Sequence, residues 1–265
     1  MTYGAVGSER NRSLFVWYET NARDLPWRRT VDPYPILVSE VMLQQTQVSR
    51  VEPKFNAFMD QWSSVEELAD ADTHELLTAW SGLGYNGRVL RLREAARSIA
   101  VNGWPVSIKG LQQLPGIGPY TAAAVGSIAF GTATPAIDTN LRRILSRWAG
   151  EPMTGSMLES YAADVFGEPA GDWNQALMDL GSTICTTRDP SCGECPVATW
   201  CLDPTVYEAP RRQPTFNGSR RQLRGALVRA QLAGDDLYEA GRKLDRPVKE
   251  VAQTIASLTE EGLLM

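Results

Sequence analysis

All four cysteines of the chain lie in one short stretch, at Cys185, Cys192, Cys195 and Cys201, with six, two and five residues between them. We do not expect disulfides, because a chain of 265 residues can bury a core without cross-links. We also expect no secretory leader. Grouped thiolates are the soft ligands that zinc or an iron–sulfur cluster requires. Zinc sites more often use two separated Cys-x-x-Cys pairs, so the single pair favours iron–sulfur and leaves zinc as the alternative.

A carboxylic acid stands in an apolar setting at Glu40. At helical spacing its face carries Ile36, Leu37, Leu43 and Gln44. Apolar neighbours disfavour the charged form of a carboxyl group and raise its pKa, which prepares a general acid. The simpler alternative is a surface glutamate on a partly exposed helix.

A second carboxyl group, Asp138, precedes a helical pattern that buries Leu141, Ile144 and Leu145. This position predicts a helix N-cap, whose carboxylate accepts hydrogen bonds from backbone N–H groups. An N-capping carboxylate should keep a low pKa and hence a negative charge that is available for chemistry.

A glycine-rich turn lies between two helical patterns, in Leu114-Pro115-Gly116-Ile117-Gly118-Pro119-Tyr120-Thr121. Gly116 and Gly118 permit a tight turn whose backbone N–H groups can clamp a phosphate at the start of a helix. A plain turn between two helices is the alternative.

Helical periodicity dominates the chain, and no window offers a convincing run of alternating strand positions. Short turns rich in Gly and Pro separate patterns of ordinary helix length. We therefore predict an all-α protein whose core covers residues 1–206 and whose linker covers 207–220. The pattern of residues 221–265 predicts a small helical module that resembles a winged helix-turn-helix. That module is either an extra contact with DNA or a partner, or a helical cap on the core.

The composition is that of an ordinary soluble protein, with 43% apolar and 22% charged residues. No apolar run approaches the roughly 20 residues that span a bilayer, so we expect a cytoplasmic protein without membrane contact. The net charge of −5 argues only weakly against nucleic acid, because arginines gather near both ends of the chain.

Several motifs in the same order make the chain similar to the endonuclease III and MutY family of DNA glycosylases, and to the MutY-type adenine glycosylases within it. The resemblance runs from about Trp17 to Cys201. It is carried by the hairpin turn, the cysteine spacing and five further segments: Leu25-Pro26-Trp27-Arg28, Ser39-Glu40-Val41-Met42-Leu43-Gln44-Gln45-Thr46-Gln47-Val48, Gly82-Leu83-Gly84-Tyr85, Asp138-Thr139-Asn140 and Asn174-Gln175-Ala176-Leu177-Met178-Asp179-Leu180-Gly181.

This resemblance implies a two-lobed helix-hairpin-helix fold, with a six-helix barrel lobe at about 26–134 and a cluster lobe from 1–25 and 135–206. The four cysteines would bind a [4Fe–4S] cluster, and Gly116 and Gly118 would grip the DNA backbone. Lyases of the family carry a lysine two residues after the second hairpin glycine, where this chain has Tyr120. Without that amine, base removal without strand scission is expected.

The resemblance also implies a role for each site residue. Glu40 would protonate N7 of an extruded adenine, while Asp138 stabilises the cationic sugar and Tyr120 and Asn140 position the carboxylate and the nucleotide. The resemblance places Trp27, Arg28 and Gln175 around the adenine. It places Leu43, Gln44, Gln45 and Tyr85 near the opposite base.

The expected function is a monomeric, monofunctional adenine glycosylase acting on double-stranded DNA with adenine opposite 8-oxoguanine or guanine. Two features depart from the family: the chain carries helical residues where relatives bear a Nudix-like domain that helps to recognise 8-oxoguanine, and Asn86 follows Tyr85 where relatives often have an aromatic residue. The alternatives are a mismatch thymine glycosylase and a redox-sensing iron–sulfur regulator that binds DNA without releasing a base.

Overall fold

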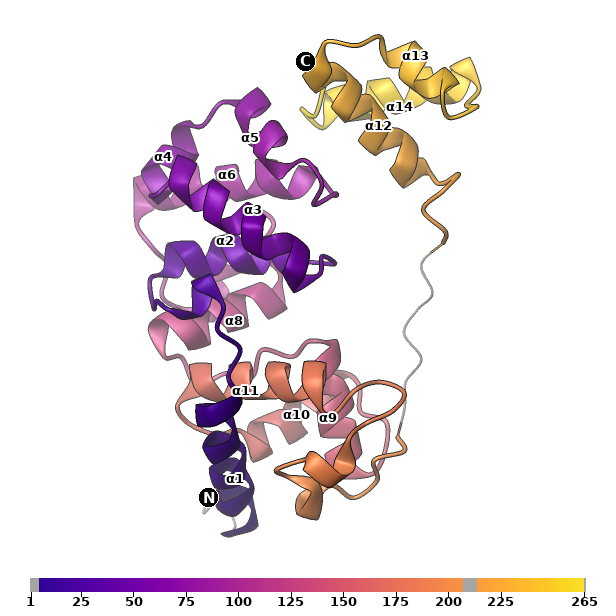
Figure 1. Cartoon of the computed structure of the whole chain (residues 1–265). Coiled ribbons are helices and arrows are strands. Elements are labelled where there is room, and N and C mark those ends of the chain that lie inside the picture. The colour runs from indigo at the N-terminus through magenta and orange to yellow at the C-terminus, as the bar shows by residue number, and fades with distance from the viewer. Residues whose placement is uncertain (1–4, 207–213, 265) are drawn as a thin grey trace. The chain divides into compact units, whose positions relative to one another are not determined.

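The computed structural model describes residues 5–206 and 214–264, and every regular element in these ranges is a helix (Figure 1). The predicted all-α class is confirmed. The chain divides into two compact units, one formed by residues 1–40 and 104–210 and the other by residues 41–103 and 211–265. The predicted lobes, 26–134 and 1–25 with 135–206, follow another division of the core and stay a prediction.

The first unit contains the hairpin, both candidate carboxyl groups and the cysteine stretch. Its helices are α1 (Ala5–Asn21), most of α2 (Pro33–Leu43), α7 (Ile108–Leu111), α8 (Pro119–Phe130), α9 (Thr139–Ala149), α10 (Gly155–Val165) and α11 (Ala170–Thr183), with short 3-10 turns η1 (Pro26–Arg28), η2 (Cys192–Glu194) and η3 (Ala198–Trp200). Its core consists of buried side chains that include Leu14 of α1, Leu141 of α9 and Trp173 of α11.

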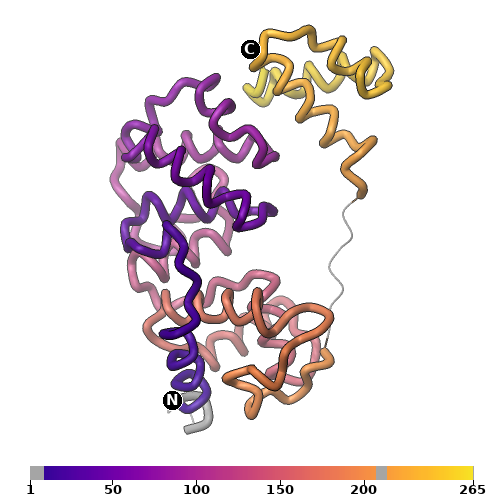
Figure 2. Tube along the Cα trace, viewed as in Figure 1, coloured from indigo at the N-terminus to yellow at the C-terminus, as the bar shows by residue number. Residues whose placement is uncertain are grey.

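The N-terminal helix of this unit packs on a segment made about 150 residues later. α1 lies against α11, as the indigo and orange traces show in Figure 2. Asn11 accepts a hydrogen bond of 3.2 Å from the indole N–H of the buried Trp173. Arg10, also buried, lies 4.2 Å from the ring of Trp148 and donates to the carbonyl of Val165. Helix α1 therefore contributes to the core through Arg10, Asn11 and Leu14.

The second unit is built around aromatic side chains. Phe58 packs against Trp62 and Trp80, with ring centroids 4.7 and 6.1 Å apart. The helices that carry this core are α3 (Val48–Gln61), α4 (Val65–Asp70), α5 (Thr73–Trp80) and α6 (Gly87–Asn102).

The C-terminal part of this unit is helical, as the sequence predicts, and consists of α12 (Arg220–Ala233), α13 (Leu237–Arg242) and α14 (Val248–Glu260). Ser219 and Asp236 cap α12 and α13 by accepting backbone N–H bonds. No strand forms between residues 214 and 264, so the resemblance to a winged helix is limited to the helices. Residues 207–213 of the predicted linker lie outside the described ranges. Within the described ranges, no helix is long and apolar enough to cross a membrane.

Candidate active site

Glu40 lies in α2 and is only 6% exposed, as its apolar surroundings predict. Its Oε2 atom is buried and has no hydrogen-bond partner among the described residues. Burial raises the pKa of this carboxyl group from 4.5 to about 7, with a smaller upward contribution from the charge of Asp138. A hydrogen bond from Tyr120 and the positive charge of Arg28 act in the opposite direction. The expected raised pKa is confirmed, and the side chain can hold a proton near neutral pH.

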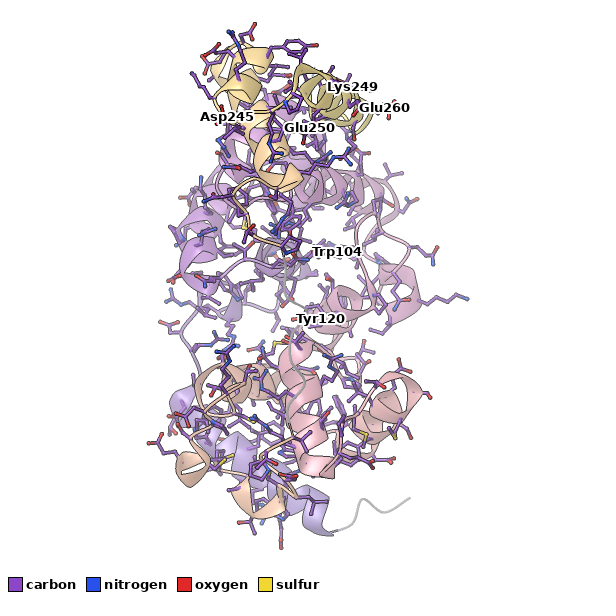
Figure 3. The ribbon with its side chains drawn as sticks, turned by 90° about the vertical axis from the view of Figure 1, so that its right-hand side faces the viewer. Trp104, Tyr120, Asp245, Lys249, Glu250 and Glu260 are labelled. Carbon is purple, nitrogen blue, oxygen red and sulfur yellow. The ribbon has the colours of Figure 1, made fainter. Side chains whose placement is uncertain are left out.

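The hairpin turn positions Tyr120 so that its hydroxyl hydrogen-bonds to the carboxyl group of Glu40. Leu114 and Ile117 anchor the turn in the core, while Gly116 and Gly118 stay exposed. Gly116 has φ 78°, a left-handed conformation that glycine adopts without strain. Gly118 is the N-cap of α8, so Tyr120 lies in the first turn of that helix (Figure 3). Burial and the nearby carboxyl groups raise the pKa of Tyr120 well above its usual value, which keeps its hydroxyl protonated as a donor.

Asp138 is the N-cap of α9, as predicted. Its Oδ1 accepts the backbone N–H of Leu141 at 2.7 Å, and its Oδ2 accepts the side-chain amide of Asn140 at 2.9 Å. The expectation of a low pKa is wrong: burial raises the pKa of Asp138, and the hydrogen bonds and the charge of Arg143 only partly oppose this effect. The buried Glu40 and the half-buried Asp138 thus influence each other electrostatically.

A buried asparagine fixes the extended segment that leads to Asp138. Asn174 is fully buried in α11, and its Oδ1 accepts the N–H of Ala136 at 2.8 Å. Its amide donates to the carbonyl of Thr134 and to the hydroxyl of Ser127, each at 2.9 Å. The sequence motif contained this residue without indicating its role, because its partners lie about 40 residues away.

Asn140 is itself held by a network that the sequence did not reveal. Arg143 donates to the Oδ1 of Asn140 at 2.9 Å and to the carbonyls of Gly181 at 2.7 Å and Cys185 at 2.9 Å. A Cβ atom at Gly181 would come within 2.7 Å of the Cβ of Asn140, so only glycine permits this close approach. A continuous set of hydrogen bonds therefore joins the start of the cysteine stretch to Asp138.

The structure also places the residues expected around the adenine. Trp27 is buried, and Arg28 donates its Nη1 and Nη2 atoms to the carboxylate of the fully buried Asp179, at 2.5 and 2.8 Å. Arg23 binds the same carboxylate at 2.6 Å, and the two arginines hold the pKa of Asp179 below its usual value. Gln175 accepts the hydroxyl of Tyr18 at 2.7 Å. Asp179, which the sequence reading did not select, thus fixes the position of Arg28.

The residues expected to act on the opposite base lie in the second unit. Leu43 ends α2, and Gln44 and Gln45 follow it in a turn; Gln45 and Tyr85 have positive φ angles of 58° and 49°. Strained angles of this kind are concentrated at functional sites.

One buried arginine, Arg88, binds both the turn that follows α2 and the turn that precedes Tyr85. Its Nη atoms donate to the carbonyls of Val41, Met42, Gln44, Leu83 and Gly84, at 2.7 to 3.1 Å. Arg88 was also missed in the sequence, where it looks like any other arginine on a helix.

The four cysteines surround one small cavity of about 70 Å³ in the first unit. Arg147 lines the same cavity and donates to the sulfur of Cys185 at 3.0 Å. In residues 5–206 and 214–264, no three His, Cys, Asp or Glu side chains converge closely enough to hold a single metal ion. The four cysteines therefore share the lining of one cavity.

Comparison with known proteins identifies the family of the chain. Residues 38–163 match the family described as the HhH-GPD superfamily base excision DNA repair protein. The adenine DNA glycosylase of Mycolicibacterium smegmatis is 41% identical over 227 residues, covering 81% of this chain and 78% of that protein. The chain belongs to the adenine DNA glycosylase family.

Two further matches extend the comparison. The human adenine DNA glycosylase is 42% identical over 208 residues, which cover 71% of this chain and 38% of the human protein. The structure of a thermostable thymine-DNA glycosylase superposes with a TM-score of 0.68 at 30% identity, over 74% of this chain and 97% of that one. The chain therefore has the helix-hairpin-helix glycosylase fold expected from the sequence, and the thymine-DNA glycosylase structure shares this fold.

Proposed function

We propose that the protein excises adenine from double-stranded DNA in which adenine is mispaired with 8-oxoguanine or guanine, as a step of base excision repair. The observation that carries this proposal is the buried Glu40, whose unpartnered oxygen and pKa of about 7 suit a proton donor. Family membership supports the reaction class. DNA is then the partner, and the expected place of action is beside the chromosome, in the cytoplasm.

In the proposed reaction, Glu40 donates its proton to N7 of the extruded adenine. Protonation makes the base a neutral leaving group, so the bond between N9 and the sugar C1′ breaks with its electron pair moving to the base. The sugar becomes an oxocarbenium-like cation, which the negative charge of Asp138 stabilises. Water then adds to C1′ and gives a proton to the Glu40 carboxylate, which restores the acid and leaves the abasic site.

The surroundings of the two carboxyl groups support this division of roles. Asp138 accepts two hydrogen bonds of 2.7 and 2.9 Å and lies near Arg143, all of which favour the carboxylate. Glu40 has one buried oxygen without a partner, which favours the protonated form. When two acids interact, the shared proton resides on the one whose environment disfavours charge, here Glu40.

Strand scission is not part of the proposed reaction. The lyase route requires an amine at the sugar, and the first turn of α8 presents Tyr120 instead. The proposed role of Tyr120 is to donate its hydroxyl to Glu40 and tune its pKa. Asn140 positions Asp138 through their hydrogen bond of 2.9 Å.

The proposed ligands of a [4Fe–4S] cluster are Cys185, Cys192, Cys195 and Cys201. The fit rests on the cavity that all four thiols line. Zinc sites more often use two separated Cys-x-x-Cys pairs, whereas this stretch has a single such pair, which favours a polynuclear cluster. When bound, the cluster would supply structural cross-linking of the 185–201 segment near Arg143 and Arg147.

The remaining expected contacts are proposals as well. Gly116 and Gly118 would bind a phosphate through the exposed turn, and Trp27, Arg28 and Gln175 would line the adenine pocket. Leu43, Gln44, Gln45 and Tyr85 would replace the extruded base and hold its partner. We expect a monomer to carry out all of these steps.

The test is single-turnover base release from four duplexes: adenine opposite 8-oxoguanine, guanine or thymine, and thymine opposite guanine. Alkali added after the reaction reveals abasic sites as strand breaks. We expect adenine release from the first two duplexes, breaks only after alkali, and no release by Glu40→Gln. Release of thymine instead would favour a thymine glycosylase, and absence of any release would overturn the proposal.

A further inference from the structure

A groove in the second unit lies between α12 and the turn of residues 81–87. It has a volume of about 460 Å³, and its walls include Gln45 and Tyr85. Arg221, in the first turn of α12, donates to the hydroxyl of Tyr85 at 3.2 Å. Helix α12 thus forms one wall of a groove whose lining also contains Gln45 and Tyr85, the two residues with positive φ described above.

The charge of the groove differs from that of the whole chain. The chain has a net charge of −5, yet five arginines and one acidic residue line the groove: Arg50, Arg91, Arg221, Arg224, Arg229 and Glu261. The single acid is already neutralised, because Glu261 pairs with Arg224 at 2.5 Å. The local excess of positive charge is therefore suited to an anion.

Aromatic side chains lie among these arginines. Tyr85 is 44% exposed and Phe216 is 54% exposed, although large apolar side chains are usually buried. Exposed aromatic rings in a basic groove are typical of surfaces that bind nucleic acid. Of the three non-glycine residues with positive φ in the described chain, Gln45 and Tyr85 both line this groove.

We propose that this groove binds the phosphate backbone of the DNA duplex, so that α12 supplies a second DNA contact beside Tyr85. The inference deepens the proposed function and rests on DNA being the substrate. Arg50 from α3 and Arg229 from α12, both exposed, are the contacts from opposite walls. Arg221 keeps Tyr85 in place between them.

The experiment measures the affinity for a fluorescent duplex by anisotropy between 50 and 300 mM salt, with undamaged DNA and with adenine opposite 8-oxoguanine. Arg50→Ala and Arg229→Ala should each reduce the slope of log K against log salt by about 1, because each removes one phosphate contact. Binding should weaken similarly on both duplexes. Arg242→Ala, which removes an exposed arginine of α13 outside the groove, is the matched control and should keep the wild-type slope.

Base release at saturating enzyme separates this inference from the proposed function. Adenine release by the wild type tests the proposed function, whereas the salt slopes of the groove variants test this inference. Wild-type slopes in both groove variants would overturn the inference even if adenine is released. Weaker binding with an unchanged slope would also overturn it, since that result indicates a change of structure and not the loss of an ionic contact.

Discussion

Replacing Glu40 by glutamine should make the protein more stable at alkaline pH while removing its activity. Glutamine has nearly the same shape as glutamate and remains neutral at every pH. The wild-type carboxyl group must ionise inside the protein as the pH rises, and its buried setting opposes that charge.

The size and sign of the effect follow from the pKa. Since one pKa unit is about 1.4 kcal/mol, the rise of the pKa from 4.5 to about 7 destabilises the folded wild type by about 3 kcal/mol above both values. The stability that protonated Glu40 contributes is fully present below pH 4.5 and is lost as the pH rises through about 7. The glutamine variant escapes this loss, so its advantage should be small near pH 5 and largest above pH 8.

The assay is thermal unfolding of wild type and Glu40→Gln at pH 5, 7 and 8.5. For a domain of this size each kcal/mol moves the midpoint by roughly 2–4 °C, so we expect the variant to gain roughly 6–12 °C at pH 8.5. Glu159→Gln, an exposed site on α10, is the control and should change stability by less than about 0.5 kcal/mol. A difference between Glu40→Gln and wild type that does not depend on pH would refute the reasoning.

Three further predictions test the surroundings of the site. Tyr120→Phe removes a hydrogen bond that lowers the pKa of Glu40, so the alkaline limb of adenine release should move up by roughly 1–2 pH units; single-turnover rates from pH 6 to 9 measure this, and an unmoved limb contradicts it. Gly181→Ala should displace Asn140 and slow base release roughly 10- to 100-fold with unchanged DNA affinity, and wild-type release would show that this contact is dispensable. Arg88→Met leaves several buried carbonyls without a donor, so unfolding by heat or urea should reveal a loss of roughly 2–4 kcal/mol; a loss below 1 kcal/mol would mean that water replaces the guanidinium.

Features that depend on neighbours in sequence could be predicted well. The apolar face around Glu40 indicated burial and a raised pKa, and both are found. Asp138 was recognisable as an N-cap from its place before an apolar helical pattern. The helices at both sides of the hairpin and in the C-terminal module follow from periodicity and turn residues in the same way.

Features that depend on remote neighbours could not be predicted. Local hydrogen bonds at the N-cap predict a low pKa for Asp138, but burial by other elements raises the pKa instead. Arg88 and Asp179 are buried charges whose partners are backbone carbonyls or arginines brought close only by folding. Arg143 likewise serves Asn140 through carbonyls about 40 residues away. Residue type and spacing contain no signal for such pairs.

The packing of α1 on α11 sets an order for folding during synthesis. Arg23 reaches its carboxylate partner only when Asp179 has been made, 156 residues later, and Asn11 meets Trp173 after 162 residues. At about 5–20 residues per second, a ribosome needs roughly 10–30 s to make that segment. The N-terminal helix therefore leaves the ribosome without its core partners, while the whole 41–103 segment is made in the interval. The first unit can close only after most of the chain is complete, so nascent chains that stop before α11 should expose Leu14 to proteases and chaperones.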